Sequence, residues 1–249
     1  MEVMIYMIKA NYCFVAHRGM HSRKQNIPEN SLGAFRLAIQ NRFAIHFEVQ
    51  QTQDNEPIVF GDYNLKRLCG LDMTMADCPI AEASRLMLNG TEYRIPTLKQ
   101  ALEFINGQVP ILIEIIDENS SEVGTLESKV IEALEDYHGV VAIQSKNPLV
   151  TLWLKIHHPH IHRGQIVNET EANEVTNFFK KTILKTQAVN FVSNPNFITY
   201  NIDDLKESYA NECHKKNIAI LGYTARTEEQ LKKAKQLCDG IIFEEIAVE

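Results

Sequence analysis

The tetrapeptide Ala16-His17-Arg18-Gly19 brings together residue types that could bind and cleave a phosphate ester. It closes a short apolar run over 12–16, which is typical of a buried strand. An imidazole can accept or donate a proton near neutral pH, and a guanidinium can hold two phosphate oxygens at once. A glycine lets the backbone approach a ligand closely. Taken alone the motif is weak evidence, because a histidine at a strand end can equally be a hydrogen-bonded structural residue.

Short apolar runs rich in valine, isoleucine and phenylalanine recur along the chain and would frame this motif. Near-continuous apolar strands are what a parallel sheet covered on both faces requires. The predicted strands are 12–16, 44–49, 57–60, 111–116, 140–143, 164–167, 189–192, 218–223 and 240–243. Helix-like stretches separate most of them, which favours an α/β barrel or a doubly wound sheet. In a barrel, catalytic residues follow the carboxyl ends of strands, as His17 and Arg18 do.

The predicted helices are amphipathic stretches with apolar residues at helical spacing. Two of them begin with recognisable signals, because Thr97 is a reasonable N-cap and the stretch from Thr227 to Gln230 has the form of a capping box. The predicted ranges are 29–41, 98–106, 126–137 and 227–237.

There is one more predicted strand than the eight of a barrel. Strands 44–49 and 57–60 are joined by a few residues with a turn signal at Asp54-Asn55, which is too short for a helical crossover. Either this connection doubles back without a helix, or one candidate is not a barrel strand. Residues 63–95 lack strand patterning and are predicted to be an excursion between a strand end and the next helix. With no linker-like tract, the chain is predicted to be a single domain, 1–249, with 63–95 as an insertion.

Composition argues against several classes of function. Lysine and arginine number 25 against 32 aspartate and glutamate, whereas a nucleic-acid binder needs a basic field. No apolar run approaches the ~20 residues that span a bilayer, and the first residues do not resemble a secretory signal. The five cysteines form no CxxC pair, which indicates neither a zinc site nor a disulfide framework. Reduced thiols in a cytoplasmic protein are expected.

In order and spacing, the segments of this chain resemble the bacterial type of the glycerophosphodiester phosphodiesterase family. The segments are AHRG, PENSLGAF, AIHFEVQQTQDNEPIVFGDYNLKR, RIPTLKQAL and ILIEII, followed by AIQSKNP, RGQI and ILGYTARTEE. The resemblance implies a (β/α)8 TIM barrel of the phospholipase C-like phosphodiesterase type, with a small insertion after the third strand. It also implies hydrolysis of phosphodiesters such as deacylated phospholipids.

In that family three carboxylates hold Mg²⁺ or Ca²⁺, two histidines act as acid and base, and an arginine and a lysine steady the phosphate. His17 and Arg18 match the first catalytic histidine and the arginine. Glu29 and Asn30 match the family's PEN motif, which implies substrate binding. Glu114 matches the third metal carboxylate.

Other positions depart from the family pattern, and they cluster in the catalytic set. His46 stands in place of the first metal glutamate and Glu48 in place of the metal aspartate. Gly61 replaces the second catalytic histidine, and Ile116 replaces the lysine that faces the phosphate. Because the scaffold motifs remain intact, we expect a retained fold with weak or altered hydrolysis. The alternative is a non-catalytic pseudoenzyme that binds a small phosphodiester or phosphate.

Two more departures lie on the substrate side. Lys146 replaces the phenylalanine of the family's SFNP segment, and Tyr223 replaces the tryptophan of its WT segment. Both positions are predicted to contact substrate. Lys146 could supply the positive charge lost at Ile116, or it could be a solvated surface lysine.

The metal, if one is bound, is expected to differ from that of the family. Mg²⁺ and Ca²⁺ prefer oxygen ligands, whereas imidazole suits transition metals. A site made by His46, Glu48 and Glu114 would therefore be more compatible with Mn²⁺ or Zn²⁺, and a site without metal also remains open. His46 could instead be a structural histidine whose hydrogen bonds are satisfied.

Overall fold

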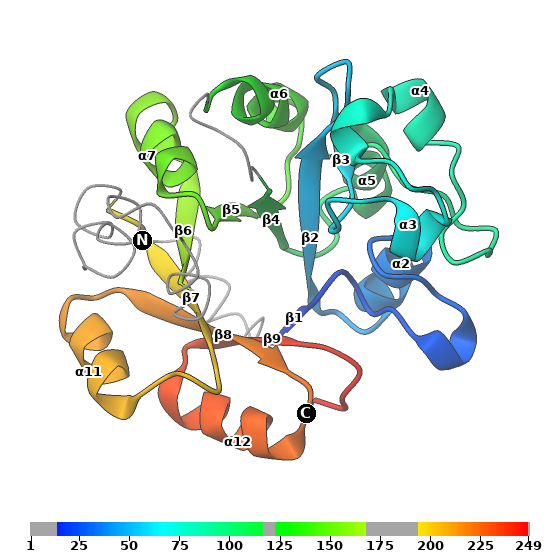
Figure 1. The fold of residues 1–249 in the computed structure, drawn as a ribbon. Coiled ribbons are helices and arrows are strands. Elements are labelled where there is room, and N and C mark those ends of the chain that lie inside the picture. The colour runs from blue at the N-terminus through cyan, green and yellow to red at the C-terminus, as the bar shows by residue number, and fades with distance from the viewer. Residues whose placement is uncertain (1–13, 117–122, 168–193, 249) are drawn as a thin grey trace. The chain divides into compact units, whose positions relative to one another are not determined.

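The computed structural model describes residues 14–116, 123–167 and 194–248 (Figure 1). These residues form two compact units. One comprises residues 15–141, and the other comprises Phe14 and the described residues from Ala142 onward. The predicted strand 189–192 lies outside the described residues, as does Cys13.

The unit of residues 15–141 is built on three parallel strands. β1 (Phe14–Ala16) pairs with β2 (Ala44–Gln51), and β2 pairs with β4 (Ile111–Ile115). Three helices of the unit contact one another in the order of the sequence, α2 with α5 and α5 with α6. They are α2 (Leu32–Gln40), α5 (Leu98–Ile105) and α6 (Thr125–Leu134).

The extra strand of the sequence analysis is β3 (Pro57–Val59), which runs antiparallel to β2. The connection between them doubles back without a helix, which was one of the two alternatives. The excursion that follows β3 contains α3 (Lys66–Cys69), η2 (Met75–Asp77) and α4 (Ile80–Ala83). It has a buried apolar cluster that includes Leu65, Leu68 and Met75.

The other unit carries five strands, each parallel to the next. They are β5 (Val141–Ser145), β6 (His162–Val167), β7 (Phe197–Asn201), β8 (Ala219–Ala225) and β9 (Gly240–Phe243). Its helices are α7 (Pro148–His157), α11 (Glu207–Lys215) and α12 (Glu228–Leu237). With β1, β2 and β4, the described residues thus contain eight parallel strands, and described helices lie between successive strands except between β6 and β7. The predicted fold class, a (β/α)8 TIM barrel, is confirmed.

The position at which α2 begins determines where Glu29 and Asn30 lie. α2 begins at Leu32 and not at residue 29, because Asn30 has a left-handed φ of 54° and donates its backbone N–H to the Arg18 carbonyl over 2.9 Å. Ser31 then caps the helix by accepting the Ala34 N–H at 3.1 Å. The two residues before Ser31 therefore lie outside the helix and beside the end of β1.

The other predicted helix signals are confirmed in different degrees. At α5, Thr97 and Gln100 form the complete capping box. At α12, Thr227 caps Gln230, but the Gln230 side chain accepts from the Arg226 N–H, so only half of the predicted box forms.

The four described cysteines form no disulfide with one another. Burial raises the pKa of the Cys238 thiol to about 12 and that of Cys69 to about 11. Among the described helices, none has both the length and the apolar character that a bilayer crossing needs.

Candidate active site

The side chains of β2 alternate between two environments because successive residues of a strand point to opposite faces. Ile45, Phe47 and Val49 are fully buried apolar residues, whereas the intervening His46 and Glu48 are polar and also buried. The strand therefore places an imidazole and a carboxylate on one face, two residues apart. This face is where the predicted site residues of the unit gather.

The chain turns sharply directly after β1. Arg18 and Gly19 both have left-handed φ values, 57° and 73°. For a non-glycine residue this conformation costs on the order of 1–2 kcal/mol. The Gly19 N–H donates to the Ala16 and His46 carbonyls at 3.2 Å, and a Cβ on Gly19 would lie 2.8 Å from Ala34 atoms. The turn thus needs glycine at 19, and it directs the Arg18 side chain back toward β2.

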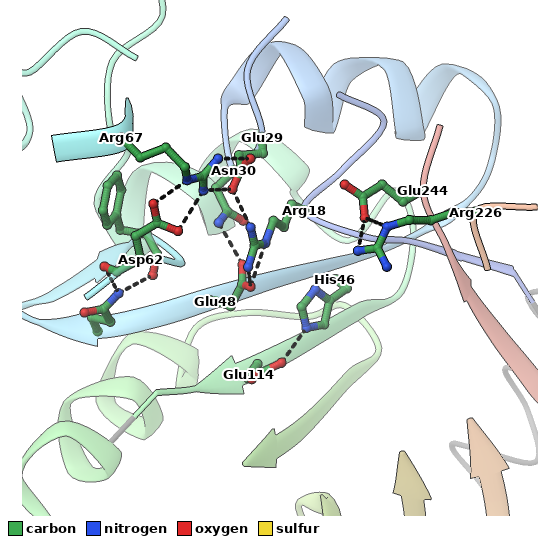
Figure 2. A network of polar contacts seen from close by, with 12 residues as sticks. Arg18, Glu29, Asn30, His46, Glu48, Asp62, Arg67, Glu114, Arg226 and Glu244 are labelled. Carbon is green, nitrogen blue, oxygen red and sulfur yellow. Dashed lines mark hydrogen bonds and ion pairs between the residues drawn. The ribbon is translucent and has the colours of Figure 1, made fainter. Parts of the chain in front are cut away.

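Arg18 binds two carboxylates at once (Figure 2). Its Nε and Nη2 both lie 2.7 Å from Glu48 Oε1, and its Nη1 donates to Glu29 Oε1 at 2.5 Å. Asn30 completes the cage by donating Nδ2–H to Glu48 Oε2 at 2.7 Å. The predicted residues Arg18, Glu29, Asn30 and Glu48 are therefore brought together by direct contacts.

Arg67, which the sequence analysis did not single out, extends this network. It comes from α3 of the excursion and donates to Glu29 Oε2 at 2.9 Å and Oε1 at 2.6 Å. It also binds Asp62, with Nε–Oδ2 at 2.5 Å and Nη2–Oδ1 at 2.7 Å. The result is a chain of alternating charges, from Asp62 through Arg67, Glu29 and Arg18 to Glu48, which we call the ion chain.

The electrostatics of the ion chain keep its buried members ionised. Burial by itself would raise the pKa of Glu48, but Arg18 first, then the neighbouring His46 and His17 and the Asn30 hydrogen bond, outweigh it and the pKa is lowered. The same balance holds at Glu29. Burial would raise its pKa, but Arg67 and Arg18 lower it by more, so the net pKa is lowered. Burial would lower the pKa of Arg18, yet the two carboxylates raise it. Buried charges are tolerated here because each one is paired.

His46 contacts the third predicted carboxylate. Its Nε2 lies 3.0 Å from Glu114 Oε2, and its side chain is only 1% exposed. A carboxylate only accepts hydrogen bonds, so in the neutral ring Nε2 carries the hydrogen and Nδ1 keeps a lone pair. Nδ1 is buried and has no hydrogen-bond partner among the described residues. The ring of His17 stacks on that of His46, with centroids 5.1 Å apart.

The residues present fit a divalent transition metal. His17, His46 and Glu48 offer ligand atoms that lie within 4.8 Å of one another, and the unpartnered Nδ1 of His46 is a donor that such an ion would satisfy. Imidazole together with carboxylate, as His46 and Glu48 offer them, suits Mn²⁺, Zn²⁺ or Fe²⁺ and suits Ca²⁺ poorly, and His17 lies close enough either to bind the ion or to serve beside it. Glu114 contacts His46 in the way that outer carboxylates orient ligating histidines.

Gly61 and Ile116 occupy two further positions at which the sequence departs from the family pattern. A Cβ on Gly61 would lie 3.1 Å from Arg18 Cζ, Arg18 Nη2 and Glu48 Oε2. The Arg18–Glu48 pair thus packs against the space that a side chain at 61 would take. Ile116 donates its backbone N–H to the Val49 carbonyl at 3.0 Å and offers no cationic side chain.

Lys146 and Tyr223 lie in the other unit. Lys146 is exposed just after β5, and its carbonyl accepts from Gln165 Nε2 at 3.1 Å. Tyr223 is half-buried in β8. Their predicted contacts with substrate stay predictions.

Comparisons with known proteins agree on one family. Residues 17–248 match the sequence model of the glycerophosphoryl diester phosphodiesterase family. Similar solved structures include a phosphodiesterase from Oleispira antarctica in complex with the product sn-glycerol-3-phosphate, which is 23% identical with a TM-score of 0.78 and covers 93% of this chain and 92% of its own. None of the curated proteins matches the chain.

Two further structures show the same fold. A glycerophosphodiester phosphodiesterase from Thermotoga maritima is 22% identical with a TM-score of 0.72, over 94% of each chain. A putative glycerophosphodiester phosphodiesterase from Galdieria sulphuraria is 19% identical with a TM-score of 0.77, over 93% of this chain and 92% of its own.

Proposed function

The chain belongs to the glycerophosphoryl diester phosphodiesterase family, and from this premise we propose that it binds glycerophosphodiesters and hydrolyses them with weak or altered activity. The observation that carries the proposal is that His46 and Glu48, the candidate metal ligands, lie beside the His17 imidazole and the Arg18 guanidinium, with ligand atoms of His17, His46 and Glu48 within 4.8 Å of one another. A cation-binding group next to an arginine is suited to a phosphodiester, because both can neutralise its charge.

We assign proton transfer to His17. Its side chain is partly exposed, whereas His46 and Glu48 are buried, so His17 is the imidazole that a substrate can reach. Arg18 would hold the phosphate oxygens, and Asn30 would keep Glu48 in place through its 2.7 Å hydrogen bond. His46 and Glu48 would hold the metal, and Glu114 would orient the His46 ring.

A metal bound there would polarise the P–O bond and neutralise the phosphate. The proposal favours Mn²⁺ or Zn²⁺ because His46 supplies nitrogen where the family supplies carboxylate oxygen. Exchanging a carboxylate for an imidazole also removes a negative charge from the site.

Weak activity follows from the missing proton-transfer group. Gly61 has no side chain, so nothing at that position can protonate the departing alcohol. The loss of one general acid or base typically costs about 10²–10⁴-fold in rate. Ile116 adds to this by leaving its position without a cation for the phosphate. Hydrolysis would therefore depend on His17, Arg18 and the bound metal.

The test is turnover of glycerophosphocholine and of a chromogenic phosphodiester, screened over Mg²⁺, Ca²⁺, Mn²⁺ and Zn²⁺. We expect slow turnover with Mn²⁺ or Zn²⁺ and less with Mg²⁺ or Ca²⁺. His17→Gln should abolish it while the dissociation constant for Mn²⁺, measured by calorimetry, changes less than about threefold. Turnover near ~10 s⁻¹, the typical enzyme median, would contradict weak activity. A large loss of Mn²⁺ affinity in His17→Gln would make His17 a ligand and not the proton-transfer group.

The second candidate function is a phosphate- or phosphodiester-binding protein without catalysis. Gly61 favours this candidate, because it offers no proton-transfer group. Its lack of a side chain also leaves room for the 2.7 Å contact between Arg18 and Glu48. Binding of glycerol phosphate together with no turnover above the His17→Gln background, with all four metals, would support this candidate.

A further inference from the structure

Glu48 belongs to two groups that need it for different purposes. Arg18 contacts its Oε1 through Nε and Nη2, both at 2.7 Å, and Asn30 contacts its Oε2 at 2.7 Å. The same carboxylate, with His46, is proposed to hold the metal. Its side chain is only 3% exposed, so its partners come from within this site. A metal cation and the Arg18 guanidinium therefore compete for one buried carboxylate.

We infer that Arg18 exchanges partners. Without ligands it neutralises Glu48, and when a phosphate ester arrives it turns to the phosphate and releases Glu48 to a divalent cation. Metal and phosphate then bind with positive coupling. This inference rests on the proposed function, because it requires that both ligands bind at this site.

The contacts of Arg18 allow such an exchange. Its Nη1 is anchored separately on Glu29, which Arg67 holds through two further hydrogen bonds. Arg18 can therefore leave Glu48 and still remain fixed by one carboxylate. A guanidinium has five N–H donors, and the 22% exposure of this side chain leaves part of it accessible to a ligand. Gly61 places no side-chain atom against Nη2, where a Cβ would lie at 3.1 Å.

The direction of the coupling follows from the cost of unpaired buried charge. A buried carboxylate that loses its only cation is strongly destabilised, so Arg18 leaves Glu48 readily only when another cation replaces it. A metal that enters while Arg18 remains on Glu48 meets a carboxylate that is already neutralised. Each ligand thus removes the obstacle to the other, and such coupling is reciprocal.

Calorimetric titration of the full chain with Mn²⁺ tests this inference. The titration is made without and with saturating glycerol 3-phosphate, and complexation of Mn²⁺ by the phosphate alone is measured and subtracted. For wild type we expect glycerol 3-phosphate to tighten Mn²⁺ binding on the order of tenfold, within the usual range of coupling between sites. Arg18→Ala should bind Mn²⁺ more tightly than wild type when no phosphate is present, and it should lose the coupling.

Two further variants keep the result interpretable. Arg18→Lys retains a cation but not the paired N–H donors, and it should show tighter Mn²⁺ binding with reduced coupling, even if Arg18→Ala fails to fold. Arg36→Ala is the matched control, since Arg36 is exposed on α2 and stacks on the Phe104 ring, and it should behave as wild type.

The failures of the two proposals are distinguishable. If wild type binds Mn²⁺ and glycerol 3-phosphate but the two do not affect each other, the exchange is overturned and the proposed function stands. If Arg18→Lys binds Mn²⁺ no more tightly than wild type, the competition for Glu48 is also overturned. If wild type binds neither Mn²⁺ nor glycerol 3-phosphate, both proposals fail.

Discussion

At the scale of single residues, the site differs from its family pattern by exchanges that support one another. His46 takes a carboxylate position and contacts Glu114 at 3.0 Å, so a second carboxylate at 46 would meet Glu114 at close range. Gly61 leaves the space against which Arg18 and Glu48 form their ion pair. Restoring the family residue at either position alone would therefore disturb a neighbouring side chain, Glu114 in the case of 46 and the Arg18–Glu48 pair in the case of 61.

The role of Glu114 can be tested by an isosteric change. Glu114→Gln keeps an acceptor for the His46 Nε2–H and removes the negative charge that orients and polarises the ring. Loss of an outer partner of this kind typically lowers metal affinity about 10–100-fold, and we expect that range for Mn²⁺ by calorimetry. His46→Gln, which removes a direct nitrogen ligand, should lose more. Equal losses in the two variants would indicate that Glu114 itself binds the ion.

Restoring the family residues should succeed only in combination. Gly61→His alone must displace the Arg18–Glu48 pair by a few tenths of an ångström, and His46→Glu alone places a carboxylate beside Glu114. We expect little hydrolysis with Mg²⁺ from either variant. The triple variant Gly61→His, His46→Glu, Ile116→Lys should exceed the product of the single effects, because groups that act as a unit are not additive. A folded but inert triple variant would contradict this expectation.

At the scale of elements, the excursion after β3 is tied to the site by one helix. α3 contributes Arg67, whose guanidinium contacts Glu29 and Asp62 through four hydrogen bonds. The apolar cluster beneath it, with Leu65 and Leu68, fixes α3 in the excursion. The position of this helix therefore influences how firmly Glu29 holds Arg18.

Arg67→Ala should weaken both stability and anion binding. Its side chain is 48% exposed, so solvent screens its ion pairs and we expect a loss of about 1 kcal/mol in the free energy of unfolding. Glycerol 3-phosphate should bind several-fold less tightly, because the negative charge of Glu29, no longer neutralised by Arg67, offsets more of the Arg18 charge that the phosphate needs.

Lys66→Ala is the matched control for this change. Lys66 precedes Arg67 on the same helix and pairs with exposed Asp72 at 3.4 Å. Urea unfolding and calorimetry on both variants give the comparison. Equal effects of the two substitutions would show that α3 acts through general charge and not through Glu29.

At the scale of the whole molecule, the ion chain makes the free energy of unfolding depend on pH in the acidic range. The pKa values of Glu29 and Glu48 lie below their usual 4.5 in the folded protein, so the unfolded chain binds more protons as the pH falls through 4.5. The stabilisation is fully present above that pH and is lost as the pH falls toward the folded pKa values. We expect the urea midpoint to decline between pH 6 and pH 3.

A substitution identifies the source of this acid sensitivity. Glu29→Gln cannot take up a proton, so its urea midpoint should vary less with pH over the same range, although it starts from lower stability. An unchanged pH dependence in this variant would place the acid-sensitive groups elsewhere.

Much of the fold was predictable because its signals are local. The apolar runs predicted seven of the nine described strands near their observed bounds, and Thr97 with Gln100 predicted the start of α5. β5 was predicted less completely, since polar Gln144 and Ser145 extend it. β7 was missed because Thr199 and Asn201 interrupt its apolar pattern. Thr199 is nevertheless buried, and its hydroxyl donates a 2.6 Å hydrogen bond to Gln144, a partner 55 residues away that no local pattern predicts.

The site was predictable where a motif is continuous and less so where contacts are distant in sequence. His17 and Arg18 stand in one motif, and the spacing of His46 and Glu48 places them on one strand face. Arg67 was missed because its partner Glu29 lies 38 residues away. That Glu114 contacts the His46 ring also depends on how β4 lies beside β2.

The antiparallel return of β3 has a consequence for how this site could diverge. The register sets Val49 opposite Val59, and the tight turn at 52–56 fixes that register. A turn longer by one residue would shift β3 by one position against β2 and bring Phe60 to the place beside the ion pair that Gly61 now holds. The length of this turn therefore determines which side chain faces Arg18, as much as the residue type at position 61 does. A relative with a turn of another length would place a different side chain there without any substitution at position 61.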